Sequence, residues 1–286
     1  MPRPTRTVRE VKLFKDKKPK EKNHTKGAFV LSFRSLAKAG FEGVFTNIVA
    51  MVLILWLPIL VSVAVAYGRL HVFETTPFVI LQGLDFLLKL WLSSSVIIAI
   101  HRSLLLSEKP AFPGFKFARR ERNAWLCNVA IMGRVLFAMA LPLALMYAAV
   151  WAMDNYPEYI WWRVMMAVFG FVFLAASFLA LDVYIRLLFA LPTVALDIEG
   201  SLKDRLDDAL EFGSGYAMTL FAAFCLVAIT FGVLMFALSF VPDTASFGLK
   251  DVLIQVAGWV YFAIVTAMYA TAYKAIKKER AKDSKA

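Results

Sequence analysis

Five charged residues lie within long apolar stretches of the sequence, where ionised side chains are costly. They are Asp85, Lys89, Arg134, Asp182 and Arg186. A charge at the centre of a membrane-spanning helix costs roughly 2.5–3.5 kcal/mol on insertion scales, so such residues normally face the interior of a helix bundle. There they can line a path for a charged solute or fix how helices pack. The sequence therefore singles out these five residues as candidates for a polar core.

The spacing of Asp85 and Lys89 predicts an ion pair. Residues four apart lie on one face of a helix, where a carboxylate and an ammonium can meet. We expect both side chains to point into the bundle rather than toward lipid. The pair is either part of a polar site or solute path, or a self-satisfied contact that fixes the packing of its helix.

A second pair is expected across a helical hairpin. Arg134 and Asp182 lie at nearly equal distances along the chain from a turn near Pro157. Antiparallel helices would bring them to similar depth, where a guanidinium can donate two hydrogen bonds to a carboxylate. Arg186 is the competing partner, because it lies one turn beyond Asp182 on the same helix.

Signatures of catalysis and metal binding are not found in the sequence. His24, His71 and His101 do not form an HExxH motif, and none has a second ligand at metal-binding spacing. The chain has neither a GxSxG motif nor a phosphate-binding GxxxxGK[ST] loop. Cys127 and Cys225 lie in different apolar stretches. We therefore expect no enzymatic activity, no metal and no cofactor.

The elements that must position the candidate residues are membrane-spanning helices. Hydrophobic residues make up 60% of the chain and charged residues 19%, against roughly 25% charged in soluble domains. Runs of about 20 apolar residues match the hydrocarbon thickness of a bilayer. The sequence predicts an all-α, multi-pass membrane protein with six transmembrane helices in three hairpins. These helices are expected at residues 44–66, 78–100, 124–153, 159–190, 216–240 and 252–273, within a membrane domain of residues 44–273.

Positive charge predicts the orientation of these helices. Lys and Arg concentrate in residues 1–40, 101–123 and 274–286, and the alternate loops are short and poor in them. Under the positive-inside rule, both termini are cytoplasmic. Residues 1–27 are expected to form a disordered basic tail, and residues 274–286 a basic cytoplasmic tail. The net charge of +11 is then explained by basic segments that flank the spans and contact anionic lipid headgroups. A nucleic-acid partner is not expected. Phe14 is the only Phe, Tyr or Trp in the basic N-terminal tail, so the tail has no series of aromatic side chains on which bases could stack.

Two amphipathic segments are expected on the cytoplasmic face. Residues 28–41 have the pattern of an interfacial helix. Residues 201–211 begin with Ser201 and Asp204, the spacing of a capping box, and Gly213 is expected to end that helix. The second helix is acidic and therefore suits a partner protein or the basic loop before the third transmembrane helix. Basic residues expected to face lipid headgroups are Arg34, Lys38, Arg119, Arg120 and Arg122.

One stretch resembles a known family. The sequence "YIRLLFALPTVALDIEGSLKDRLDDAL", with an arginine closing a span, Leu191-Pro192, Glu199-Gly200 and Ala209-Leu210, is similar to the membrane domain of bacterial glycerophosphodiester phosphodiesterases. That family includes related six-helix inner-membrane proteins. This chain lacks the Ser-Trp pair that usually follows Ala-Leu. The resemblance implies a stand-alone membrane domain in a bacterial inner membrane, without the catalytic residues, which belong to a separate barrel domain of roughly 250 residues.

Two functions remain open from the sequence. The first is a non-catalytic role in the inner membrane, organising lipid or assembling with partner proteins at the cytoplasmic face. The second is transport of a small charged solute by Asp85, Lys89, Arg134 and Asp182. A water-filled cavity that reaches Lys89 would favour transport, and a closed, packed bundle would favour the first function.

Overall fold

A computed structural model describes residues 32–72, 78–109, 118–156, 160–241 and 248–283 of the chain. The basic tail expected at residues 1–27 lies outside this range. Within it the secondary structure is helical, without strands: α1 Phe33–Phe45, α2 Ile48–Val72, α3 Phe78–Leu106, α4 Arg119–Asn155, α5 Ile160–Leu187, α6 Ala190–Ala195, α7 Leu202–Phe212, α8 Ala217–Ser239 and α9 Leu249–Asp283.

Six helical segments in the described part of the chain are long and apolar enough to cross a membrane. They are α2, α3, α4, α8, α9 and the continuous stretch of α5 and α6. The predicted fold class is therefore confirmed. The basic segment expected at residues 274–286 is helical as far as Asp283, because α9 continues without a break to that residue. Residues 274–283 contain neither Gly nor Pro, and Ala, Lys, Glu and Arg favour helix.

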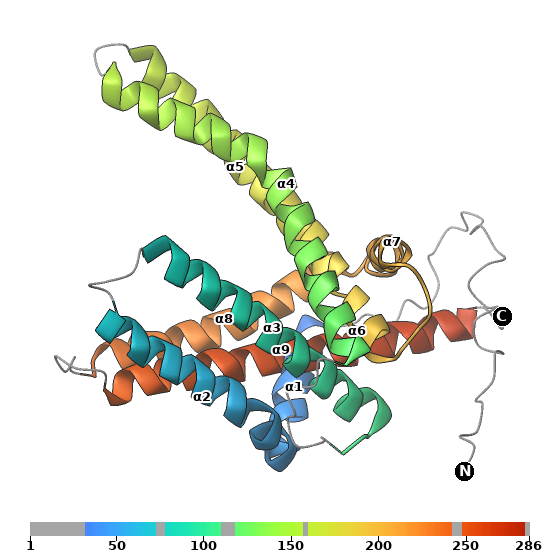
Figure 1. Ribbon diagram of the computed structural model, residues 1–286. Coiled ribbons are helices and arrows are strands. Elements are labelled where there is room, and N and C mark those ends of the chain that lie inside the picture. The colour runs from blue at the N-terminus through green and yellow to red at the C-terminus, as the bar shows by residue number, and fades with distance from the viewer. Residues whose placement is uncertain (1–31, 73–77, 110–117, 157–159, 242–247, 284–286) are drawn as a thin grey trace.

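Helices α2, α3, α8 and α9 form a bundle around α9, and α1 packs against α8 and α9 (Figure 1). α1 begins and ends later than the interfacial helix expected at residues 28–41. Its Leu36 and Gly40 are buried, whereas Phe33 is exposed. A β-carbon at Gly40 would lie 2.8 Å from the carbonyl oxygen of Ile264 in α9. Glycine therefore permits the close approach of these two helices.

The hairpin of α4 and α5 leaves the bundle at an angle, so the molecule is V-shaped (Figure 1). The hairpin meets the bundle where α4 packs on α3 and α5 packs on α8, close to α6 and α7. We call this the vertex end. Only 11% of the most apolar stretch of α4 and 6% of that of α5 is buried, against 44% in α9. Most of the hairpin surface therefore faces the surroundings rather than the protein core.

The vertex is held together by a short buried helix and an aromatic cluster. α6 is apolar, and all but one of its residues are buried. The ring of Phe189 contacts those of Phe212 and Tyr269 edge to face, at centroid distances of 5.2 and 5.4 Å. Gly213 closes α7 as predicted, and a β-carbon there would lie 3.1 Å from the Cα atom of Arg186. These contacts tie the ends of α5 and α7 to α9.

Candidate functional site

The predicted ion pair of Asp85 and Lys89 is present, with the Lys89 Nζ atom 3.1 Å from an Asp85 carboxylate oxygen. The Asp85 side chain is buried at 8% exposure, but the Lys89 side chain is 44% exposed. The expectation that both point inward is therefore correct for Asp85 and wrong for Lys89. Four residues turn a helix about 40° past a full revolution, and the long lysine stem extends further outward.

Lys89 borders an open hollow of about 360 Å³ on the side of the bundle, between α3 and α9. Its lining is mainly apolar, with Phe86, Trp259 and Phe262 among the residues beside Lys89. The hollow is a feature of the outer surface of the bundle. The aqueous path expected for a transporter is a different arrangement, since it runs through the interior of the bundle from one side of the membrane to the other.

The predicted pair of Arg134 and Asp182 is wrong. Arg134 instead donates to Asp207 of α7 at 3.3 Å. Asp182 binds Arg186, one turn along α5, at 2.6 Å. Helix α7 packs beside α4 and α5, and this places the carboxylate of Asp207 within ion-pair distance of Arg134. The acidic helix therefore contacts α4, although not at the basic residues where we expected it to bind.

Of the basic residues expected to face lipid headgroups, Arg34, Lys38, Arg119 and Arg122 are exposed. Arg120 is also exposed, but it is engaged by Asp197, with Nε–O distances of 2.6 and 2.7 Å. Arg102 of α3 donates to the same carboxylate at 3.2 Å and to the carbonyl of Ala195 at 2.8 Å. Asp197 thus joins the end of α3 to the start of α4.

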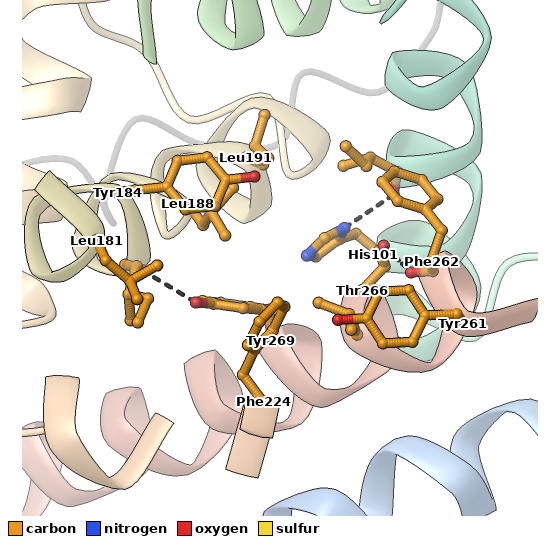
Figure 2. A pocket seen from close by; sticks show the side chains of 13 residues that line it. His101, Leu181, Tyr184, Leu188, Leu191, Phe224, Tyr261, Phe262, Thr266 and Tyr269 are labelled. Atoms are coloured by element: carbon orange, nitrogen blue, oxygen red, sulfur yellow. Dashed lines mark hydrogen bonds between the residues drawn. The ribbon is translucent and has the colours of Figure 1, made fainter. Parts of the chain in front are cut away.

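A partly open cavity of about 220 Å³ lies at the vertex, where α5 meets α3, α8 and α9 (Figure 2). Its walls are largely Leu, Ile, Val and Phe side chains. The polar groups among them are His101, Tyr184, Tyr261, Thr266 and Tyr269. An apolar cavity with a few convergent polar groups is the usual form of a small-molecule site. This cavity is therefore the strongest candidate site in the described part of the chain.

His101 is the most unusual group in this cavity. It is 1% exposed, and its Nδ1 atom lies 2.8 Å from the carbonyl oxygen of Ile97. Its Nε2 atom is buried and has no hydrogen-bond partner among the described residues. Figure 2 shows this nitrogen facing the open space between α3 and Tyr184. Buried polar atoms in native proteins are normally paired, so Nε2 is an atom with which a molecule bound in the cavity could form a hydrogen bond.

The tyrosines differ in whether their hydroxyl groups are engaged within the protein. Tyr269 donates to the carbonyl of Ile185 at 3.3 Å, which links α9 to α5. The hydroxyl groups of Tyr184 and Tyr261 make no hydrogen bond within the described range. Both lie at the edge of the cavity (Figure 2). They are available to a molecule that enters it.

In the sequence, His101 differs from its neighbours only as a histidine without a second metal ligand at suitable spacing. The other polar lining residues come from α5 and α9, so no local motif connects them. The one usable signal was a histidine within an apolar helix, which marks a functional position in membrane proteins. In the described part of the chain, no cluster of three or more His, Cys, Asp or Glu side chains is arranged to hold a metal ion.

Comparisons with known proteins do not add to the geometry. No protein-family model, curated protein or solved structure matches the chain. The resemblance to the membrane domain of glycerophosphodiester phosphodiesterases stays a prediction that rests on residues 184–210.

Proposed function

We propose that this chain is a non-catalytic integral membrane protein that holds a lipid between the α4/α5 hairpin and the bundle. The observation that carries the proposal is the largely apolar cavity at the vertex, which α5 of the hairpin and three helices of the bundle line together. A lipid could enter from the side, because the two arms of the V diverge from this point (Figure 1).

The charged candidates favour this function over solute transport. Asp85 binds Lys89, Arg134 binds Asp207, and Asp182 binds Arg186. These are three separate ion pairs. Two of them join residues of the same helix, one pair in α3 and the other in α5. A transport path instead needs polar groups that line a continuous cavity and can exchange partners with the solute. We therefore rank lipid binding above transport of a small charged solute.

We further propose that the protein resides in a bacterial inner membrane with both termini in the cytoplasm. The vertex end would then lie at the cytoplasmic surface. Exposed Arg34, Lys38, Arg119 and Arg122 would meet anionic headgroups there. The exposed carboxylates of Asp208 and Glu211 on α7 would offer an acidic surface to a basic protein partner.

The test compares two leucines of α5 that differ in position. Leu181 lines the cavity, whereas Leu179 is 70% exposed on the hairpin. Leu181→Trp should fill the cavity and Leu179→Trp should leave it open. Each protein is extracted from membranes in mild detergent, and the lipid retained per protein is measured by native mass spectrometry. Thermal unfolding of both variants checks that they are folded.

We expect the wild type and Leu179→Trp to retain lipid, and Leu181→Trp to lose most of it. Equal retention by all three proteins would mean that lipid is bound at the outer surface only. Absence of retained lipid in the wild type would rule out a stable lipid complex.

A further inference from the structure

The geometry of the His101 ring shows which of its two nitrogens carries the proton. A carbonyl oxygen only accepts hydrogen bonds, so the 2.8 Å contact with Ile97 requires a proton on Nδ1 of His101. In a neutral imidazole, the other nitrogen then carries a lone pair. No Asp or Glu side chain lines the cavity, so a second proton on the ring would have no counter-charge there. His101 Nε2 is therefore an acceptor.

This acceptor selects for the chemistry of the ligand. A hydrocarbon chain leaves Nε2 unpaired, and so does an ester or an ether, because neither group donates a hydrogen bond. A hydroxyl group both donates to Nε2 and tolerates an apolar surrounding once it is paired. The neighbouring hydroxyl groups of Tyr184 and Tyr261 can in turn donate to carbonyl oxygens of the ligand.

We propose that the bound lipid is an alcohol of the diacylglycerol class, whose free hydroxyl donates to His101 Nε2 and whose ester carbonyls accept from Tyr184 or Tyr261. This inference rests on the proposed function and names the ligand class for that site. A cavity of about 220 Å³ accommodates the glycerol end of such a molecule. The acyl chains would leave it between the hairpin and the bundle (Figure 1).

Water is the competing occupant of this position. A buried water normally makes two to four hydrogen bonds, and it needs that many polar partners within reach. Of the five polar groups in the lining, Thr266 and Tyr269 already donate to backbone carbonyls, and most of the surface is hydrocarbon. An amphiphile pairs the acceptor and covers the apolar wall with the same molecule.

The test uses two photoreactive diesters that differ in one atom group. One is a diacylglycerol with a diazirine in an acyl chain, and the other carries hydrogen in place of the hydroxyl. The second probe is the smaller, so the cavity cannot exclude it by size. Both are incorporated into vesicles with the full-length protein, and the amount of cross-linked protein is measured over a range of probe concentrations.

Wild-type protein should need about ten-fold less of the alcohol than of the deoxy diester for equal labelling, as expected for one hydrogen bond worth about 1.4 kcal/mol. His101→Leu should remove this preference and label equally with both probes. His101→Gln should restore part of it, because an amide oxygen can accept the same hydrogen bond. Cross-links should map to α3, α5 or α9.

The outcomes separate this inference from the proposed function. Equal labelling of the wild type by both probes would overturn the role of the hydroxyl while leaving lipid binding intact. If neither probe labels a wild-type protein that still retains lipid in a Leu181-dependent way, the ligand belongs to another class and the inference is wrong. If no lipid is retained either, the proposed function itself fails.

Discussion

At the scale of single residues, partners are chosen by whichever opposite charge is nearest on a neighbouring turn or helix. Asp85 forms an ion pair with Lys89, and Asp182 forms one with Arg186, each four residues away. Arg134 forms an ion pair with Asp207, which lies on another helix. Pairs within a helix follow from spacing and were accessible from the sequence. The contact of Arg134 was not, because it depends on where α7 packs.

The pair of Asp85 and Lys89 predicts an asymmetric response to mutation. Lys89→Leu removes the ammonium beside a buried carboxylate and should destabilise the protein by about 1–3 kcal/mol, below the full value for a buried pair because Lys89 is half exposed. The double variant Asp85→Asn, Lys89→Leu should recover part of this loss. Thermal unfolding in detergent measures both. A double variant less stable than the single one would show that the carboxylate has a separate structural role.

Neighbouring carboxylates on α7 predict opposite effects of similar substitutions. Partial loss of solvent around Asp208, and then the nearby carboxylates of Asp204, Glu211 and Asp207, raise the pKa of Asp208 above its usual value. Its charge therefore costs stability above that folded-state pKa, and the cost fades as the pH falls through it. Asp208→Asn should stabilise the protein slightly at pH 7, by less than about 1 kcal/mol. Asp207→Asn should destabilise it, because Asp207 binds Arg134.

The pH dependence of unfolding distinguishes these two effects. Thermal unfolding of the wild type and both variants would be followed from pH 7 to pH 3. The gain from Asp208→Asn should vanish at the acidic end, where the wild-type carboxyl is protonated. A gain that persists there would have a cause other than charge.

At the scale of elements, glycine determines how closely α1 approaches α9. A β-carbon at position 40 would lie 2.8 Å from a backbone oxygen, which cannot move aside as a flexible side chain would. Gly133 in α4 has no atom within 4 Å of the corresponding position among the described residues. A substitution at Gly40 therefore tests the packing of α1 on α9, whereas the same substitution at Gly133 tests helix propensity alone.

Gly40→Ala should destabilise the protein by about 1–3 kcal/mol through overcrowding. Gly133→Ala should be neutral or stabilising by up to about 1 kcal/mol, because alanine favours the helix. Thermal unfolding in one detergent compares them directly. Equal effects of the two substitutions would mean that α1 is not held against α9.

The helical elements could be predicted from the sequence because their signals are local. Long apolar runs predict the spans, and the capping box of Ser201 and Asp204 is present as expected. The site could not be predicted, since His101, Tyr184 and Tyr261 come from three helices far apart in the chain. The splayed hairpin could not either. The most apolar stretches of α4 and α5 have no polar face, so their sequence does not indicate which face meets protein and which meets lipid.

At the scale of the whole molecule, the proposed orientation predicts which surface positions are accessible from outside the cell. In a variant without Cys127 and Cys225, a cysteine at Tyr156, at the end of α4, should react with a membrane-impermeant maleimide in intact cells. A cysteine at the exposed Lys203 of α7 should react only after the cells are lysed. Labelling of Lys203→Cys in intact cells, with protection of Tyr156→Cys, would reverse the orientation.

The divergence of the two arms has a mechanical consequence for the bilayer. α4 contains 37 residues and is therefore about 55 Å long, nearly twice the hydrocarbon thickness, so in the proposed orientation it is inclined or extends past the hydrocarbon at its charged first turn. A molecule with joined helices at one surface and separated helices at the other takes up unequal areas of the two leaflets. Such a wedge should concentrate where curvature expands the leaflet at its open end. Its density in membrane tubes drawn from giant vesicles, relative to the flat parent membrane, should depart from one and reverse direction when the protein is inserted the opposite way round.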